Sequence, residues 1–282
     1  MPTASARQRV PGHELRSAPR LIQSRQNARV KDLRAAFARA GRSDGGYIAV
    51  EGEHLLGEAL ASGLHFAAVF VQTGSEAILD RLHLPASIEV LALPPEVFAS
   101  AAGTESPQGI AALLRPPSFT LDQVLTNSEN RTPLIVVSAG LQDPGNLGTL
   151  IRTAEAFGAT GFVLLPGTVS LFNQKTLRAS SGSVFRLPCA NAKPEALFTA
   201  LKKRGVSAIA AVASDGNALT ACDLTRPSAI ILGNEGNGIS EEILKLIEQR
   251  VTIHTPGPVE SLNAAIAGSI LLYEATRQRT KR

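Results

Sequence analysis

The sequence contains only two cysteines, Cys189 and Cys222, among 282 residues. This number excludes a framework of several disulfides and a cluster of thiolate metal ligands, and it fits a reducing compartment. Neither cysteine belongs to a motif, which favours buried or inert thiols. The five histidines are not spaced as metal ligands, so we expect structural roles for them and no bound metal.

Long hydrophobic runs are also missing. The longest stretch without a charged residue, 156–174, is interrupted by glycines and Pro166, which is typical of a strand and a turn. The residues near Met1 include no apolar segment, so we expect no secretory signal. With 44% apolar and 18% charged residues and a mean hydropathy of +0.08, the chain is predicted to be globular and cytoplasmic, without a membrane segment.

Positive charge is concentrated at the start of the chain. Residues 1–42 hold ten Lys and Arg against Glu14 and Asp32, which gives this segment a net charge of +8. Because the whole chain carries +4, the remainder carries −4. A globular body with a basic end is typical of a protein that binds nucleic acid. A solubilising tail and an organellar transit peptide are the alternatives that charge alone leaves open.

Alternating apolar runs and helical patterns predict two α/β units. A basic flexible arm is expected over 1–20, where the chain is polar and contains prolines, and a first unit over 21–115. In this unit a helix should begin near Val30. The other elements expected are strands at 47–50, 67–71, 88–91 and 110–114, and helices at 54–61, 75–82 and 95–101.

Residues 116–132 combine Pro, Ser, Asn and Thr and are predicted to form a linker. The second unit, 133–282, should contain buried parallel strands, because its apolar runs are β-branched and bounded by turns. The chemistry is expected in this unit. The elements expected there are strands at 134–138, 162–165, 207–213, 229–232 and 250–254, and helices at 147–157, 194–204, 240–247 and 261–279.

The first segment that indicates a function spans residues 141–165. A strand ends in a turn at 143–146 and leads into a helix, whose free N-terminal amides favour an anion. Arg152 lies six residues beyond Asn146, one to two turns into this helix. Its side chain can therefore reach the carboxyl ends of the strands, where open α/β sheets bind ligands. The alternative is a well-capped helix with an exposed arginine.

The second segment, 231–240, runs from a strand into Gly233, Gly236 and Gly238, with Glu235 among them. Glycines after a strand allow a backbone to approach a ligand closely. A tight turn would explain the glycines equally well, but it would not require the carboxylate. The spacing matches neither the dinucleotide fingerprint nor the phosphate-binding loop of nucleoside triphosphatases.

The third segment is 254–279. Prolines on both sides of Gly257 predict a rigid turn, after which Ser261 is placed to cap the terminal helix and Asn263 lies in its first turn. From 264 to 273 the helix is apolar on nearly every side, which predicts close packing against another element or another subunit. An ordinary buried helix explains the apolar part but not Asn263 at its start.

Together and in this order, these segments resemble the signature motifs of the SpoU (TrmH-like) branch of the SPOUT RNA methyltransferases. The residues that carry the resemblance are 144–148 with 152–154, then 233–236, then 258–263. The segment 178–182 also resembles the family. In the first half, 50–52 and 106–110 resemble its smaller ribosomal-protein-L30e-like α/β domain, which binds the RNA substrate.

This resemblance implies a C-terminal α/β methyltransferase domain with a parallel sheet and a deep trefoil knot. It also implies S-adenosylmethionine (SAM) as methyl donor without a metal, a homodimer through the C-terminal domain, and transfer to a ribose 2′-hydroxyl of RNA. Ribosomal RNA is favoured over tRNA. By motif position, the adenosine part of SAM is expected to bind the backbone of Gly233, Ile253 and Leu262.

The same resemblance implies the catalytic residues. A 2′-hydroxyl becomes a good nucleophile only when its proton is removed or its developing oxyanion is stabilised. Because a guanidinium hardly deprotonates, we expect Arg152 to stabilise the oxyanion and bind a neighbouring phosphate. Asn146, Ser261 and Asn263 are expected to orient the ribose and the loop, and Glu235 to organise the turn after its strand.

Two other classes of protein remain as alternatives. A catalytically weak RNA-binding or ribosome-assembly factor could share the fold, although retention of the polar motif residues argues against it. A Rossmann-type nucleotide enzyme would need a fingerprint that the sequence lacks. The arm and the first unit are expected to bind a structured RNA through its phosphates and its shape.

Overall fold

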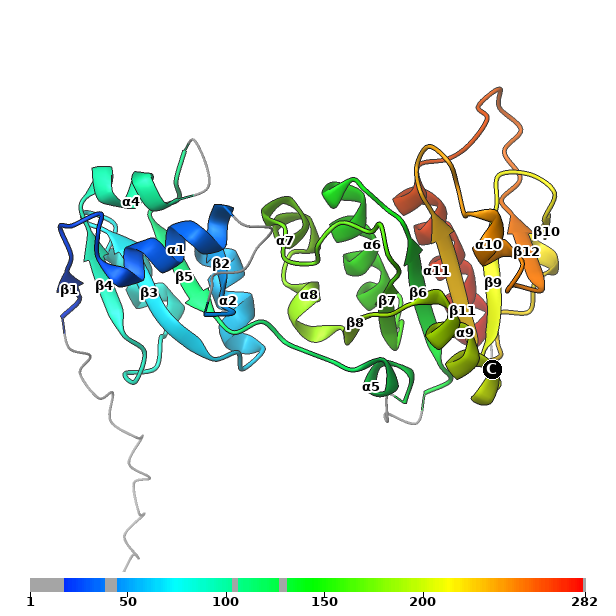
Figure 1. The fold of residues 1–282 in the computed structure, drawn as a ribbon, viewed down its shortest axis with the longest axis horizontal. Coiled ribbons are helices and arrows are strands. Elements are labelled where there is room, and N and C mark those ends of the chain that lie inside the picture. Colours follow the sequence, from blue (N-terminus) through cyan, green and yellow to red (C-terminus); the bar gives the residue numbers. More distant parts are fainter. Residues whose placement is uncertain (1–17, 39–44, 103–105, 127–130, 281–282) are drawn as a thin grey trace, which may run out of the picture.

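A computed structural model describes residues 18–38, 45–102, 106–126 and 131–280. They form two α/β units, each built around its own sheet, that follow one another along the long axis of the molecule (Figure 1). Most of the expected arm lies outside the described residues. Arg20, at its end, belongs to strand β1, which pairs with β4 of the first sheet, although its side chain is exposed.

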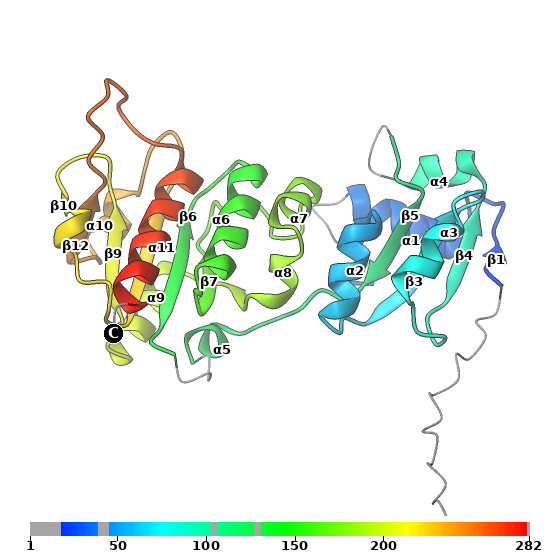
Figure 2. The same ribbon diagram turned by 180° about the vertical axis from the view of Figure 1, so that it is seen from behind.

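The first sheet has five strands in the order β1-β4-β3-β5-β2. β3 pairs in parallel with β4 and antiparallel with β5. Helices α1 and α4 lie on one face of this sheet, and α2 and α3 lie on the other (Figure 2). Successive side chains of a strand point to opposite faces, so Phe70 packs with α1 and α4 while Val69 and Val71 pack with α2 and α3. The elements are β1 (Arg20–Leu21), α1 (Ala28–Ala38), β2 (Ile48–Glu51), α2 (Glu53–Ala61), β3 (Phe66–Gln72), α3 (Ala77–Leu82), β4 (Val90–Leu93), α4 (Pro95–Ala101) and β5 (Ile110–Leu114).

The segment between the two units contains a short helix, α5 (Leu121–Leu125). Thr120 and Gln123 form a capping box at its start, in which each side chain binds the other residue's backbone amide. Val124 is buried against Gly161, where a β-carbon would collide with it. The expected linker is therefore partly folded onto the second sheet.

The second sheet has seven strands in the order β10-β12-β9-β11-β6-β7-β8, and each pairing is parallel. The prediction of parallel strands is confirmed, and every residue of β6 and of β7 is buried. The strands expected at 207–213 and 250–254, which are β9 and β12, are only partly buried. The elements are β6 (Leu134–Ala139), α6 (Pro144–Ala156), β7 (Gly161–Leu164), α7 (Gln174–Ser180), α8 (Ser183–Arg186), β8 (Cys189–Asn191), α9 (Pro194–Lys203), β9 (Ser207–Ala211), β10 (Asn217–Ala218), the 3-10 turn Leu219–Ala221, β11 (Ser228–Gly233), α10 (Glu241–Leu244), β12 (Gln249–Thr252) and α11 (Ala264–Thr280).

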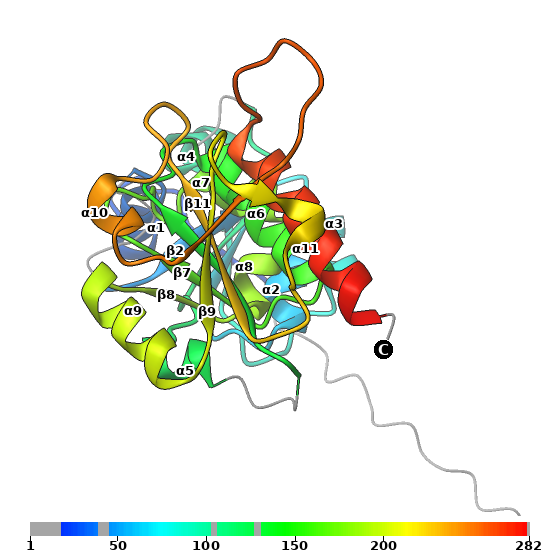
Figure 3. The same cartoon turned by 90° about the vertical axis from the view of Figure 1, so that its right-hand side faces the viewer.

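Helices cover both faces of this sheet, as a parallel sheet requires. In β6, Leu134 and Val136 face the side of α6 and α11, whereas Ile135 and Val137 face the side of α5 and α9. Seen along the long axis, α11 lies on one side of the strands and α9 and α10 on the other (Figure 3). Helices therefore cover the central strands on both faces, which leaves the ends of these strands as the place for a ligand.

The terminal helix begins later than expected. Helix α11 starts at Ala264, and Asn263 caps it by accepting hydrogen bonds from the amides of Ala265 and Ile266 at 2.9 and 3.2 Å. The prediction that Ser261 caps this helix is wrong, because the loop after Pro258 continues through residue 263 before the helix begins. Ser261 lies exposed in the preceding loop.

The far end of α11 is attached to the amino edge of the sheet. The guanidinium of Arg279 donates hydrogen bonds of 2.7 to 3.1 Å to the carbonyl oxygens of Thr132, Pro133, Leu224 and Arg226. These carbonyls precede β6 and β11. One side chain therefore satisfies four acceptors at the base of two central strands.

No helix within the described residues is both long and apolar enough to cross a bilayer.

The close packing of α11 on α6 depends on Gly268. A β-carbon there would collide with Leu150 of α6 and Leu232 of β11. We expect Gly268→Ala to lower the free energy of unfolding by about 1–3 kcal/mol in a denaturant titration, although alanine is the better helix former.

The control is Gly57→Ala in α2, where a β-carbon would make only an ordinary contact with Leu82. This variant should gain up to about 1 kcal/mol. Equal gains for both variants would contradict the steric argument.

Candidate active site

The carboxyl edge of the second sheet brings the first two sequence segments together. β6 and β11 are neighbours, and Gly233 at the end of β11 pairs with Ala139 at the end of β6. The loop that leads into α6 and the glycine-rich loop after β11 therefore start side by side. This edge is where open α/β sheets bind ligands.

The glycine-rich loop folds back on itself. Asn234 and Gly238 exchange backbone hydrogen bonds of 2.9 and 3.0 Å, and the side-chain oxygen of Asn234 accepts from the amides of Gly236 and Asn237. Its side-chain nitrogen donates to the carbonyl of Gly140 at 2.8 Å. Asn234 thus fixes the loop to the neighbouring strand, a role that its sequence pattern did not predict.

Glu235 connects the glycine-rich loop to the start of α6. Its carboxylate accepts hydrogen bonds from the amides of Gln142 and Asp143, each at 3.3 Å, and from the side chain of Asn146 at 3.1 Å. Burial acts to raise the pKa of Glu235, but the bonds from Asn146 and the backbone amides outweigh it, so this pKa is below its usual range. The carboxylate therefore stays charged at neutral pH.

Asn146 extends this connection to the third segment. Its side-chain oxygen accepts a hydrogen bond of 2.9 Å from the side chain of Asn263, which also caps α11. Glu235, Asn146 and Asn263 therefore form one hydrogen-bonded chain across three loops. The structure thus brings together three of the five residues expected to be catalytic.

A salt bridge supports the start of α6 from the other side. Asp143 caps α6 by accepting from the amide of Asn146 at 2.8 Å, and it pairs with Lys175 of α7 at 3.0 Å. The bond from the Asn146 amide, and then Lys175, hold the pKa of Asp143 below its usual range. The sequence predicted a turn at 143–146 and free amides at the helix start, and it predicted neither this cap nor Lys175.

The other two expected residues lie apart from this chain. Arg152 lies on the exposed side of α6, and the described part of the protein offers its guanidinium no hydrogen bond or ion pair. Ser261 is exposed in the loop before α11 and lines the adjoining pocket. An exposed guanidinium without a protein partner is available to bind an anion.

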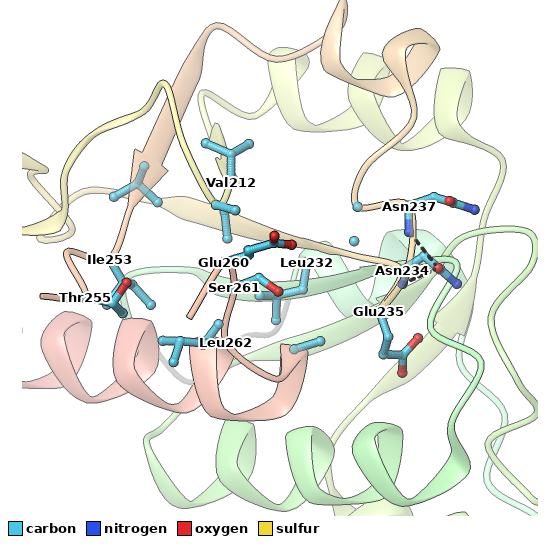
Figure 4. Close-up of a pocket in the computed structure, with 18 residues that line it drawn as sticks. Val212, Leu232, Asn234, Glu235, Asn237, Ile253, Thr255, Glu260, Ser261 and Leu262 are labelled. Atoms are coloured by element: carbon cyan, nitrogen blue, oxygen red, sulfur yellow. Dashed lines mark hydrogen bonds between the residues drawn. The ribbon is translucent and has the colours of Figure 1, made fainter. Parts of the chain in front are cut away.

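A pocket of about 350 Å³ lies next to the hydrogen-bonded chain (Figure 4). Its walls include the three residues expected to bind the cofactor, Gly233, Ile253 and Leu262. Val212 and Leu232 add apolar surface, and the folded glycine-rich loop adds exposed backbone. The volume falls in the range of small-molecule sites, and the lining combines apolar and polar surface.

The pocket fits the adenosine part of SAM on two grounds. Gly233 approaches the backbone of Gly238 and Ile239 so closely that a β-carbon would collide with both, so the loop can form this wall only with glycine there. The apolar side chains of Ile253 and Leu262 face the pocket from the opposite side (Figure 4). A flat, uncharged ring can lie between such surfaces.

The cysteines and possible metal ligands contribute nothing visible to this site. Burial raises the pKa of the Cys189 thiol, and that of half-buried Cys222 is raised for the same reason. Across the described ranges, no group of three or more His, Cys, Asp or Glu side chains is arranged to hold a metal ion.

A parallel sheet with a small-molecule pocket and a polar cluster at its carboxyl edge defines an α/β enzyme. Residues 133–273 match the SpoU rRNA Methylase family, and residues 27–112 match the MRM3-like substrate binding domain. The chain belongs to the SpoU family of RNA methyltransferases. A substrate-binding domain was expected in the first unit, and the matching domain is the MRM3-like one. The L30e-like description is not confirmed by name.

Similar proteins match nearly the whole chain in sequence and in fold. The 23S rRNA (guanosine(2553)-2'-O)-methyltransferase RlmP of Bacillus subtilis is 33% identical over 89% of this chain and 97% of its own. The crystal structure of the SpoU methyltransferase AviRb from Streptomyces viridochromogenes with AdoMet has 26% identity and a TM-score of 0.79, covering 90% of this chain and 99% of that one. An AdoMet-bound rRNA methyltransferase from Sinorhizobium meliloti has 28% identity and a TM-score of 0.78, covering 92% and 97%.

These comparisons confirm the prediction of a SAM-dependent RNA methyltransferase. They favour it over the assembly-factor alternative, since relatives are named as methyltransferases. The prediction of an α/β fold with a parallel sheet is confirmed as well.

Glu235 should be needed for cofactor binding, because it holds the glycine-rich loop in place. In Glu235→Gln one acceptor oxygen becomes a donor that faces other donors. We expect the affinity for SAM, measured by isothermal titration calorimetry, to fall about tenfold. Glu241→Gln, at the exposed start of α10, is the matched control. Equal affinities of both variants would contradict this role.

Proposed function

We propose that the protein transfers a methyl group from SAM to a ribose 2′-hydroxyl of RNA at the edge formed by β6, β11 and α11. The observation that carries this proposal is the hydrogen-bonded chain of Glu235, Asn146 and Asn263 beside the pocket. It joins three sequence segments that are far apart in the chain.

In this proposal the backbone of Gly233, Ile253 and Leu262 holds the adenosine part of SAM, between apolar side chains. When bound, SAM supplies a methyl group that its sulfonium charge has already activated. The protein's own residues then have to orient the ribose and stabilise the oxygen that attacks. No metal is required for that step.

Arg152 stabilises the developing 2′-oxyanion and binds the neighbouring phosphate, while the proton leaves to phosphate or water. A literal role as base would conflict with the guanidinium, which stays protonated in proteins. Asn146, Asn263 and Ser261 orient the ribose and the loop, and Glu235 keeps the two asparagines in position. The free guanidinium of Arg152 and the exposed position of Ser261 support these roles.

The chain is also proposed to form a trefoil knot and a homodimer. After β12 it passes the pocket and returns as α11 against α6 and β11, which is consistent with threading of the C-terminal segment. On α11, Ile266 and Tyr273 are 51% and 56% exposed and lie seven residues apart on one side. Such an apolar face supports pairing with a second copy through the C-terminal domain.

The substrate is proposed to be ribosomal RNA rather than tRNA. Relatives named for 23S rRNA, from Bacillus subtilis and Streptomyces viridochromogenes, support this choice. The first unit would bind the RNA and present it to the second. Any contribution of the basic arm concerns residues outside the described part of the chain.

The reaction is tested by incubating the protein and labelled SAM with total RNA from a strain that lacks the modification. We expect label in a 2′-O-methyl nucleoside at one position of ribosomal RNA. Label in tRNA would correct the substrate. Absence of label, with SAM and RNA binding intact, would contradict the reaction.

Arg152 is tested by Arg152→Ala. We expect kcat to fall about 10²- to 10³-fold, as when another enzyme loses one group that stabilises an oxyanion, while affinity for SAM stays the same. Arg226→Ala is the matched control, because this exposed arginine lies before β11 at the opposite edge of the sheet. A near-normal kcat in Arg152→Ala would remove this residue from the mechanism.

A further inference from the structure

Three sequence segments that resemble the family have no part in the site described above. They are residues 178–182, in α7 and the turn after it, and residues 50–52 and 106–110 in the first unit. In the structure they lie at or next to one boundary, where α2 of the first unit faces α7 and α8 of the second (Figure 2). We call this boundary the α2 seam.

The α2 seam begins with two hydrogen bonds. Gln174 of α7 donates to the carbonyl oxygen of Ala49 in β2 at 2.9 Å. Further along, the imidazole of His54 and the hydroxyl of Ser181 lie 2.7 Å apart. Residues 178–182 thus contribute Ser181 to a contact with the other unit.

Gly182 allows the units to approach closely. It has a φ of 87°, and a β-carbon there would lie 2.6 Å from the β-carbon of Glu58. Any other residue would be strained at this φ and would push α2 away. The glycine at the end of the 178–182 segment therefore has a steric reason in the α2 seam.

Arg186 completes the α2 seam with charge. Its guanidinium forms two hydrogen bonds to the carboxylate of Glu155, at 2.7 and 2.9 Å, and also binds Glu58 of α2. Glu155 lies in α6, three residues after Arg152. One guanidinium therefore connects the first unit directly to the helix that carries Arg152.

The other two segments fix α2 to its own sheet. The buried carboxylate of Glu51 accepts a hydrogen bond of 2.9 Å from the amide of Gln108, and the side chain of Gln108 lies over Gly52 at the start of α2. The start of α2 is thus tied to the loop before β5. A shift of α2 would therefore move the first sheet with it.

The polar contacts determine orientation, whereas apolar contacts supply attraction. Buried apolar residues around α2 and around α6 to α8 belong to one continuous cluster. Hydrophobic burial has no direction, so it does not by itself select one rotation between the units. Hydrogen bonds and a bidentate guanidinium require a defined geometry.

We propose that Glu58, Arg186 and the rest of the α2 seam are positioning residues, which hold the RNA-binding unit in one orientation to α6. When the first unit binds an RNA, the target ribose then lies close to Arg152, and neither unit has to rotate against the other. This inference rests on the proposed function, because it assigns the RNA to the first unit and the reaction to the second. None of these seam residues touches the pocket.

The test compares Glu58→Gln with Glu53→Gln. Both residues lie on α2, but Glu53 pairs with Arg81 inside the first unit and forms no hydrogen bond or ion pair with the second in the described residues. We expect Glu58→Gln to raise the KM for RNA about two- to fivefold, the size of one partly exposed charged contact. The kcat at saturating RNA and the affinity for SAM should stay at wild-type values.

Hydrogen exchange gives a second readout that is independent of activity. Amides of α2, α7 and α8 should exchange faster in Glu58→Gln, while those of β6 and β11 stay unchanged. The double variant His54→Ala/Glu58→Gln should strengthen both effects.

Two results would overturn the proposal. One is equal KM and equal exchange in Glu58→Gln and Glu53→Gln. The other is a joint fall in kcat, SAM affinity and melting temperature, which would indicate a general loss of structure. A wild-type protein without methyl transfer would instead refute the proposed function itself.

Discussion

The active-site region depends on one carboxylate. Glu235 accepts hydrogen bonds from two backbone amides and from Asn146, and these donors lie at the start of α6, 89 to 93 residues earlier in the chain. The carboxylate gives these donors at the start of α6 one fixed partner, where water alone would hold neither loop in place. Because Asn146 also binds Asn263, the position of the last helix depends on the same group. The pocket wall, the start of α6 and the cap of α11 are therefore coupled.

Those parts of the structure that follow from local patterns could be predicted from the sequence. The strand expected at 134–138 is β6, and the strand expected at 229–232 is β11, because runs of buried β-branched residues have few other solutions. Short polar elements could not be predicted. Helices α7 and α8 have seven and four residues, too few for a helical period to stand out. The cap of α11 moved from Ser261 to Asn263, since two small polar residues near a turn are equivalent until the loop is built.

Contacts between segments that are distant in the chain could not be predicted from the sequence either. The glycine-rich loop indicated a turn with a carboxylate, but not which amides would bind it. The 178–182 segment indicated the family. The structural roles of Ser181 and Gly182 became clear only from their contacts with His54 and Glu58. Both cases concern residues whose partners are set by tertiary packing rather than by sequence spacing. The motif therefore identifies these residues, and the folded structure shows which partners they have.

The attachment of Arg279 affects the lifetime of the fold. Its four hydrogen bonds join the end of α11 to carbonyls that precede β6 and β11. Any route that draws this end of the helix off the sheet has to break all four. Such a cost falls on the unfolding rate when the bonds form late in folding. The end of α11 then slows unfolding of the native state. It does so at the edge of the sheet farthest from the candidate active site.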